Sequence, residues 1–366
     1  MLHTFGLPAI EWPKNNCERT VFMACFFFLG ANSKDGFVSL LPQFQRESPR
    51  RLYAIKGGPG CGKSTCIRRL SDALGGAEEY FLCSSDPDSL DGAALPGLAL
   101  LDGTAPHVFE PAFPGCDGDY LSLPPVLDRQ ELAAQAPALY ALKAASAAHY
   151  AQAYRLLKAA ALLREDRRER MQALLLRDPL HRAEALLREI PKGPGPGRLR
   201  LRFLDGITPK GQLCLWDTVS HGFHRVIALR DSCGLSHPLL ERLRDGALER
   251  GQEVYACLDP LEPQRILHLL LPGCGLAFVT RREGDLPFVP SRTVHPDAMV
   301  DKEALAKERP LLRLKKHVET SLLADAVSEI AAAHTLHDHM EAIYKPHIDL
   351  AAMETHYQQL LNCIRG

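Results

Sequence analysis

The stretch GGPGCGKST, from Gly57 to Thr65, constrains the fold of this chain more than any other feature of its sequence. It follows an apolar run at residues 52–55, typical of a strand, and precedes residues 66–70, typical of the first turns of a helix. The spacing GxxxxGK[ST] is met in full at Gly57, Gly62, Lys63 and Ser64. A strand, a glycine-rich turn and a helix in this order predict an α/β domain built around a phosphate-binding loop.

The residue types in this loop suit the chemistry of a nucleoside triphosphate. Glycines allow backbone N–H groups to turn inward and surround an anion, and the helix N-terminus adds a partial positive charge. Lys63 is the expected catalytic cation on the β- and γ-phosphates, and the Ser64 hydroxyl is an expected Mg²⁺ ligand. We expect the nucleotide to be held by Gly57, Gly58, Pro59, Gly60, Cys61, Gly62, Lys63, Ser64 and Thr65.

An acidic position completes the predicted site. Residues 98–101 form an apolar run that ends on Asp102, as in strands whose terminal carboxylate holds Mg²⁺ beside a phosphate loop. We therefore expect Asp102 to act with Lys63 in catalysis and with Ser64 as a metal ligand. No Asn-Lys-x-Asp guanine signature follows this strand, so ATP is the expected nucleotide rather than GTP.

These motifs do not identify a general base. Many ATPases with a phosphate loop carry Glu directly after the acidic residue, but here Gly103 follows. The candidates for a base or a water-positioning group are Asp86, Asp88, His107 and Glu110. For Asp86 and Asp88, an Asp-Pro turn with a helix cap is an equally good interpretation.

Ordered internal matches predict that the chain is a duplication. They pair residues 28–36 with 203–211, 51–55 with 225–229, 86–87 with 259–260, and 95–97 with 271–273. Strands separated by helix-length segments predict that each half is a mainly parallel sheet with flanking helices. Each half then closes with long helices, and residues 129–189 are expected to form a helical hairpin whose final helix is broken by Pro179.

The composition of residues 191–197, PKGPGPG, places a linker between the halves. The predicted organisation has four parts. They are an N-terminal extension at 1–24, a nucleotide-binding domain at 25–191, a linker at 192–197, and a second domain at 198–366.

The second half is predicted to have lost its phosphate site. At the matching place it reads RVIALRDSCGLSH, which we align with two residues missing from the loop and with Asp231 and Ser232 where glycines stood. In this alignment Leu235 replaces Lys63, and the third strand ends at Thr280 rather than at an acid. A carboxylate in the loop repels phosphate, so we expect a non-catalytic copy.

Composition narrows the classes of function. A hydrophobic content of 46%, a charged content of 24% and a net charge of −1 are typical of a soluble globular protein and do not indicate a nucleic-acid binder. Eleven cysteines without a C-x-x-C pair indicate a reducing, cytoplasmic setting. The apolar run at residues 21–29 is too short to span a bilayer, and we expect its second half to be a strand.

Two weaker signals lie on predicted helices. A cluster of His334, His337, Asp338 and His339 has helical spacing, but a solvated or interface face is favoured over a metal site. The run from Arg164 to Arg170 mixes charges and predicts an exposed face with ion pairs. Its alternatives are a grip on a polyanion and an arginine finger on the γ-phosphate.

The sequences GGPGCGKS, CSSDPDSLDG and LDGTAPH, followed by a second phosphate-loop-like half, resemble a group of bacterial proteins. These are uncharacterised ATP-binding proteins of the P-loop NTPase superfamily, with two such domains in tandem. The resemblance runs from about Phe27 onward and implies nucleotide binding at Gly57–Thr65 and Asp102, without a settled reaction.

We therefore expect two tandem P-loop NTPase-like domains, of which the first hydrolyses Mg-ATP. One alternative is a phosphotransferase in which Asp86 or Asp88 activates an acceptor hydroxyl. Another is a non-hydrolysing regulatory or scaffold protein. The helical segments leave room for a protein partner or a homo-oligomer, and no membrane partner is expected.

Overall fold

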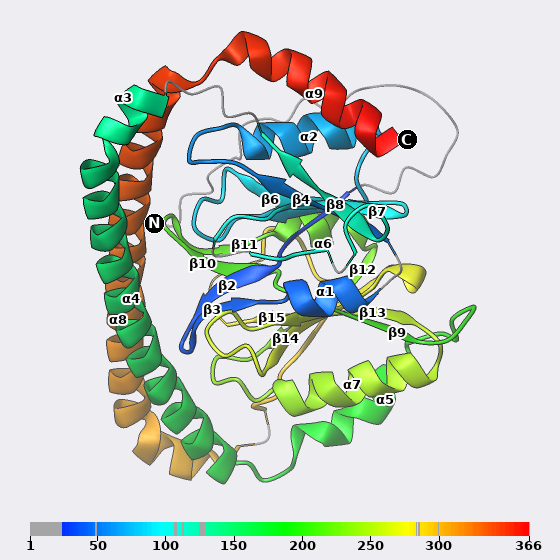
Figure 1. Ribbon diagram of the computed structural model, residues 1–366. Helices are drawn as coiled ribbons and strands as arrows, with labels where there is room; N and C mark the ends of the chain where they lie inside the picture. The colour runs from blue at the N-terminus through cyan, green and yellow to red at the C-terminus, as the bar shows by residue number, and fades with distance from the viewer. Residues whose placement is uncertain are drawn as a thin grey trace.

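The computed structural model describes residues 24–47, 50–105, 108–111, 113–123, 129–282, 284, 286–298 and 300–365. Within them, two six-stranded sheets lie one above the other, and a pair of very long helices runs along one side of both (Figure 1). None of the helices in these ranges is long and apolar enough to cross a membrane. The predicted extension falls almost wholly in residues 1–23, which lie outside the described residues.

The first sheet surrounds the predicted loop. Its strands, in spatial order, are β1 (Cys25–Phe28), β5 (Glu79–Leu82), β6 (Leu90–Leu95), β7 (Leu98–Asp102), β4 (Arg51–Lys56) and β8 (Gly118–Ser122). Only β6 runs antiparallel to its neighbours, and the other adjacent pairs are parallel. The apolar residues 52–55 of β4 are all buried, as expected for a central strand covered on both faces.

The second sheet repeats this order strand for strand. It consists of β9 (Arg198–Arg202), β13 (Glu253–Leu258), β14 (Ile266–Leu271), β15 (Leu276–Arg281), β12 (Arg225–Arg230) and β16 (Arg292–Val294). Each half also carries a separate two-stranded antiparallel sheet, formed by β2 (Gly30–Ser33) with β3 (Gly36–Ser39) and by β10 (Asp205–Thr208) with β11 (Gly211–Cys214). The predicted pair of similar halves is confirmed.

The sheets are mixed because β6 and β14 reverse direction, and sequence reasoning missed both strands. The Leu-Pro-Gly segments are the turns of β6–β7 and β14–β15 hairpins rather than ends of long loops. The hydrogen bonds at the ends of these strands also correct one internal match, that of residues 86–87 with 259–260. Cys83 and Asp259 occupy equivalent positions, since each donates its N–H to the residue just before β6 or β14, so Asp86 corresponds to Glu262.

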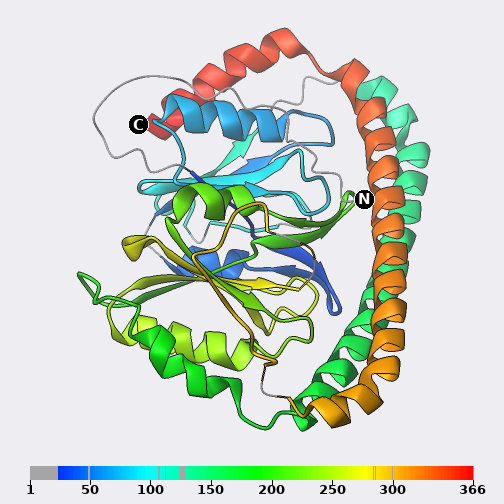
Figure 2. The ribbon, with the colours of Figure 1, turned by 180° about the vertical axis from the view of Figure 1, so that it is seen from behind.

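Short helices and charged side chains join the two sheets. Helix α1 (Leu41–Glu47) lies against β9, and α6 (Trp216–Gly222) lies against β1, so each half covers the other between the sheets (Figure 2). Arg202 of β9 is fully buried and bonds both Glu79 and Glu47 of the first half at 2.7 Å. Burial alone would raise the pKa of Glu79, but Arg202 and Arg200 hold it below its usual value.

The long helices form a hairpin between the halves, not within them. Helix α4 (Ala136–Ala173), which follows the short α3 (Arg129–Ala134), packs along α8 (Lys302–Tyr344). Small buried residues such as Ala153, Ala160 and Ala326 allow the helices to approach closely. The predicted hairpin within residues 129–189 is therefore wrong. The helix ends at Ala173, and Pro179 begins the 3₁₀ helix η1 (Pro179–Arg182) instead of breaking a helix.

Each long helix is followed in the chain by a short helix that packs on the opposite half. After α4, helix α5 (Ala183–Leu187) packs on α7 (His237–Glu249) of the second half. After α8 and the 3₁₀ helix η3 (Lys345–His347), helix α9 (Leu350–Arg365) packs on α2 (Lys63–Ala73) of the first half (Figure 1). The chain thus exchanges terminal helices between its own halves.

Candidate nucleotide-binding site

The predicted phosphate loop joins β4 to α2, and its glycines are required by the backbone. Gly60 and Gly62 have φ angles of 68° and 78°, in the left-handed region that only glycine adopts without strain. Helix α2 begins at Lys63, so its N-terminal turn opens onto the loop. Cys66, Ile67 and Leu70 form the buried face of α2 and fix it on the sheet.

Lys63 and Asp102, the two predicted catalytic residues, are brought together at the carboxyl ends of β4 and β7. The Lys63 ammonium lies 3.8 Å from Asp102 Oδ2 and within 3.4 Å of the Gly57 and Gly58 carbonyl oxygens. The other oxygen of Asp102 accepts hydrogen bonds from the Thr104 N–H (2.8 Å) and hydroxyl (2.6 Å). Oδ2 is thus held toward the loop.

The Ser64 hydroxyl is positioned by a backbone donor. Its oxygen accepts a hydrogen bond from the Leu90 N–H at 2.9 Å, at the start of the strand that the sequence did not predict. A hydroxyl oxygen has a second lone pair, so this contact leaves Ser64 able to bind a cation. The structure therefore places the lysine beside the carboxylate and leaves the Ser64 hydroxyl with a free lone pair at the start of α2.

The residue after Asp102 is closely packed, and a side chain there would have to displace its neighbours by a few tenths of an ångström. A Cβ at Gly103 would lie 3.1 Å from Lys56 Cε and 3.2 Å from Ala54 Cβ. Lys56 donates instead to the Gly103 carbonyl oxygen at 2.7 Å and to Glu110 at 3.4 Å. The predicted candidate Glu110 therefore lies beside this loop, where a hydrogen bond from Tyr120 keeps its pKa below the usual value. His107 lies outside the described residues.

The two aspartates after β5 have other partners. Asp86 accepts from the Ser89 hydroxyl (2.5 Å) and the Asp88 N–H (3.3 Å), which is the turn role that the sequence left open. Asp88 forms an exposed ion pair at 2.6 Å with Lys210 in the β10–β11 turn of the second half. Neither contact points to base chemistry.

The phosphate loop is covered by residues from the far end of the chain, and sequence reasoning identified none of them. A Cβ placed on Gly58 would meet the Tyr344 ring at 2.8 Å, and one on Gly60 would lie 3.4 Å from Glu341 and 3.5 Å from Lys345. One on Gly62 would lie 3.7 Å from the Met353 methyl group. No local sequence pattern could have indicated this, because α8 and α9 come from the other half.

Helix α9 is held firmly beside the loop. Glu354 forms a two-pronged ion pair with Arg69 of α2 at 2.8 and 2.9 Å, and the Arg69 guanidinium lies 4.0 Å from the centre of the Tyr357 ring. The Tyr357 hydroxyl donates to the Arg69 carbonyl oxygen at 2.8 Å. His356 contacts the Ser122 carbonyl oxygen, at the end of β8, at 2.6 Å.

The corresponding loop of the second half has the same length, which corrects the predicted deletion. Residues 231–236 join β12 to α7 just as residues 57–62 join β4 to α2. Gly234 therefore matches Gly60 and also has a positive φ, of 80°. The residue in the place of Lys63 is His237 rather than Leu235. Its Nδ1 accepts from the Ile266 N–H at 3.0 Å, and burial lowers its pKa.

The carboxylate of Asp231 fills the anion-binding position of this second-half loop. It accepts the backbone N–H groups of Cys233 (3.1 Å), Gly234 (2.8 Å) and Ser236 (2.6 Å). Arg265 donates to the Gly234 carbonyl oxygen at 2.6 Å from outside the loop. Asp231 thus occupies the loop itself, rather than only repelling a phosphate there.

The arginines of the run 164–170 are mostly buried against this loop, so the predicted exposed face is wrong for them. Arg164 pairs with Glu319 at 2.7 Å, and Arg167 pairs with the same carboxylate and donates to the Ser232 carbonyl oxygen at 3.0 Å. Arg168 makes a two-pronged pair with Glu262. Only Arg170 keeps the predicted half-exposed pairing within the helix, with Asp166 at 2.9 Å. These partners leave no arginine of the run aimed at the first-half loop.

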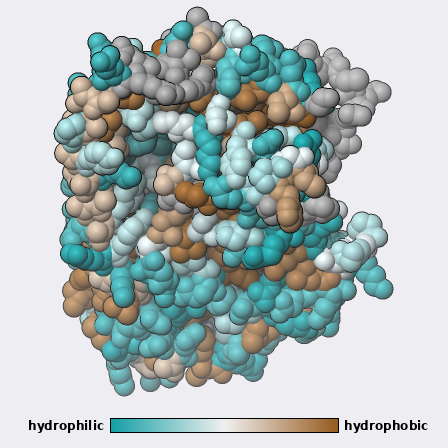
Figure 3. Space-filling view, in the orientation of Figure 1, coloured by the Kyte–Doolittle hydropathy of each residue, from teal (hydrophilic) through white to brown (hydrophobic). Residues whose placement is uncertain are grey.

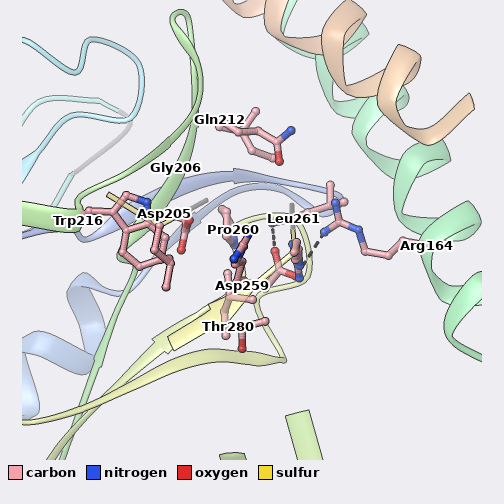
Figure 4. Close-up of a pocket in the computed structure, with 14 residues that line it drawn as sticks. Arg164, Asp205, Gly206, Gln212, Trp216, Asp259, Pro260, Leu261 and Thr280 are labelled. Atoms are coloured by element: carbon pink, nitrogen blue, oxygen red, sulfur yellow. Dashed lines mark hydrogen bonds and ion pairs between the residues drawn. The ribbon is translucent and has the colours of Figure 1, made fainter. Parts of the chain in front are cut away.

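A small cavity of about 170 Å³ lies at the carboxyl ends of β13 and β15, beside α4 (Figure 4). Asp259 is buried in its wall and pairs with Arg164 at 3.4 Å and with Arg282. Burial would raise the pKa of Asp259, but Arg282 and Arg164 hold it well below its usual range. The charges around this cavity are therefore paired with one another.

Asp205, Cys214 and His268 approach one another at the edge of this cavity, with ligand atoms within 4.8 Å. His268 Nδ1 accepts the Thr280 N–H at 3.1 Å, so the ring proton of a neutral imidazole lies on Nε2. Nε2 is 2.6 Å from Asp205 Oδ2 and donates to it. The contact is therefore a hydrogen-bonded pair, in which the nitrogen that would bind a metal carries a proton.

The histidines of α8 do not form a metal-binding group among the described residues. His334 lies 3.9 Å from Asp338, and His337 lies 3.5 Å from Glu341, each one helical turn away. These pairs lie along the helix surface, which agrees with the prediction of a solvated face.

Apolar side chains are also exposed on the α4–α8 pair, whose surface is at the left of Figure 3. They include Tyr140, Leu162 and Leu314.

The chain matches none of the known protein families, curated proteins or solved structures with which it was compared. The resemblance to tandem ATP-binding proteins therefore stays a prediction. The functional argument depends on the geometry of the loop and its neighbours.

Proposed function

We propose that the chain is an ATPase that binds Mg-ATP in the first half, at Gly57–Thr65 and Asp102, and hydrolyses it there. The observation that carries this proposal is the approach of Lys63, the first residue of α2, to Asp102 at the end of β7, with Lys63 Nζ 3.8 Å from Asp102 Oδ2. The ammonium would neutralise the β- and γ-phosphates, while Ser64 and Asp102 would hold Mg²⁺.

The second-half loop supports the proposal from within the same molecule. Its backbone N–H groups converge on the Asp231 carboxylate, so a loop of this length between a strand and a helix can direct several N–H groups at one negative charge. In the first half, Gly57 stands where Asp231 stands in the second half and brings no carboxylate. Phosphate is the anion that this loop would take, and one nucleotide site per chain follows.

Calorimetric titration with Mg-ATP and Mg-GTP, together with phosphate release in water, tests the proposal. Lys63→Ala should weaken ATP binding about 10- to 100-fold, since a hydrogen bond to a charged group contributes about 1.5–3 kcal/mol. Arg68→Ala, which removes an exposed cation from the same helix, is the matched control and should bind as the wild type does. Ser64→Ala and Asp102→Asn should raise the Mg²⁺ concentration needed for binding.

The outcomes separate the classes of function. Phosphate release with water as the sole acceptor supports an ATPase. ADP formation only when an acceptor is supplied indicates a phosphotransferase, and binding without turnover indicates a regulatory protein. A wild-type protein that binds neither nucleotide contradicts all three.

A further inference from the structure

Two charged residues belong to the cover over the phosphate loop. A Cβ placed on Gly60, the central glycine, would lie 3.4 Å from Glu341 Cβ and 3.5 Å from Lys345 Cγ. Both belong to the second half, at the junction of α8 and η3. A nucleotide in the loop would therefore lie next to one acidic and one basic group that its own half does not supply.

The two groups are paired with each other. Lys345 Nζ lies 3.3 Å from Glu341 Oε2, and His337 lies 3.5 Å from the other oxygen of Glu341. The hydrogen bond from His337 and that from Lys345 lower the pKa of Glu341 to about 2, so this group is a carboxylate at neutral pH. The Lys345 side chain is 64% exposed, and rotation of its torsions can carry the ammonium away from Glu341.

We propose that Lys345 is a second phosphate-binding cation of the nucleotide site, contributed by the second half and paired with Glu341 until a nucleotide binds. The Lys345 stem already lies beside Gly60, and the ammonium is three bonds beyond the Cγ atom that makes this contact. A triphosphate in the loop offers more negative charge than one carboxylate, so the ammonium exchanges one partner for a stronger one.

The second half also places a cation beside the equivalent loop glycine. There the long helix that covers the loop is α4, and Arg168 lies 3.6 Å from a Cβ placed on Gly234. Arg168 is buried and bound by both oxygens of Glu262, and Asp231 fills the loop. A cation at the loop glycine is thus common to both halves, but the first-half cation is exposed, and its loop begins with Gly57 where the second-half loop begins with the carboxylate of Asp231.

This inference rests on the proposed function and extends it, since it makes the nucleotide site composite. It predicts opposite effects for two neighbouring residues. Lys345→Ala should weaken Mg-ATP binding about tenfold, and Lys345→Arg should restore it to within about threefold of wild type. Glu341→Gln should tighten binding about threefold, because it removes a negative charge from the loop and releases Lys345.

Calorimetric titration of these full-length variants with Mg-ATP is the test, with Lys307→Ala as the control for an exposed lysine elsewhere on α8. Thermal unfolding of each variant checks that the fold is kept. If Lys345→Ala binds within twofold of wild type while Lys63→Ala does not, the inference is wrong and the proposed function stands. If Lys345→Ala and Glu341→Gln weaken binding alike, the pair is structural and the inference is also wrong. A wild-type protein that binds no ATP contradicts both.

Discussion

Phe28 and Phe203 hydrogen-bond to each other in both directions, with Phe28 N–H donating to Phe203 O at 2.8 Å and Phe203 N–H donating to Phe28 O at 3.1 Å. These residues are equivalent positions of the internal repeat. Each contacts its own counterpart, as residues do across the axis of a symmetric dimer. The two halves are therefore related as two subunits would be, although one chain contains both.

This relationship explains why helices cross between the halves. In a symmetric pair, an element that leaves one unit for the other is matched by one that returns, and α5 on α7 is matched by α9 on α2. The exchange places residues of α8 and α9 over the phosphate loop and residues of α4 over the second-half loop. Each loop is therefore in contact with a helix that begins in the other half.

The docking of α9 predicts one consequence for stability. Leu361 is only 6% exposed and packs with the main core, so Leu361→Ala should lower the free energy of unfolding by about 2–4 kcal/mol. Leu314→Ala, at a 59% exposed position of α8, should cost less than about 0.5 kcal/mol. Urea unfolding measures both. Equal effects would mean that α9 does not dock on the first half in solution.

The buried ion pairs between the sheets predict a dependence on acid. The pKa of Glu79 is lowered in the folded state, so its stabilising contribution is present above the unfolded value of about 4.3 and is lost as pH falls through the folded value. Stability should therefore fall below about pH 4.3 in the wild type. Urea unfolding at a series of pH values from 7 to 3 measures this.

Replacing the carboxylate separates this contribution from that of other acids. Glu79→Gln should lose about 3–5 kcal/mol at pH 7, because Arg202 and Arg200 keep their charges with one partner fewer. Its stability should then change less with acid than that of wild type. Glu249→Gln, at an exposed position, is the control. If the free energy of unfolding of Glu79→Gln depends on pH as that of wild type does, another group takes up the proton.

The loop of the second half predicts an anion site that one substitution opens. Asp231→Ala removes the acceptor of three backbone N–H groups, and it should cost about 2–4 kcal/mol. Sulfate at millimolar concentration should then raise the melting temperature of this variant more than that of wild type, because the loop N–H groups accept the added anion. Asp245→Ala, on the exposed face of α7, is the matched control. Equal sulfate effects in all three proteins would show that the loop closes without its carboxylate.

Local patterns in the sequence determined much of this protein. The spacing of motifs and hydrophobic runs predicted the strand, loop and helix around Gly57–Thr65 and the strand ending at Asp102, because these features depend on residues close in the chain. Ordered matches between the two halves predicted the repeat. The structure confirms the two similar α/β halves. ATP binding and turnover at the first loop stay predictions until they are measured.

Only the tertiary structure decided how the halves meet. The β6 strand, LDGAAL, looks like a loop because Asp and Gly interrupt its apolar residues, and pairing with neighbours makes it a strand. The ILHLLL run of β14 has the apolar pattern of a buried strand, which sequence reasoning overlooked. The long helices showed no partner in sequence, and the first was assigned one within its own half. The equal length of the second loop also needed the structure, since the bounds of β12 and α7 define it. The approach of Lys345 to Gly60 joins residues from opposite halves, and only packing of the whole chain brings such distant residues together.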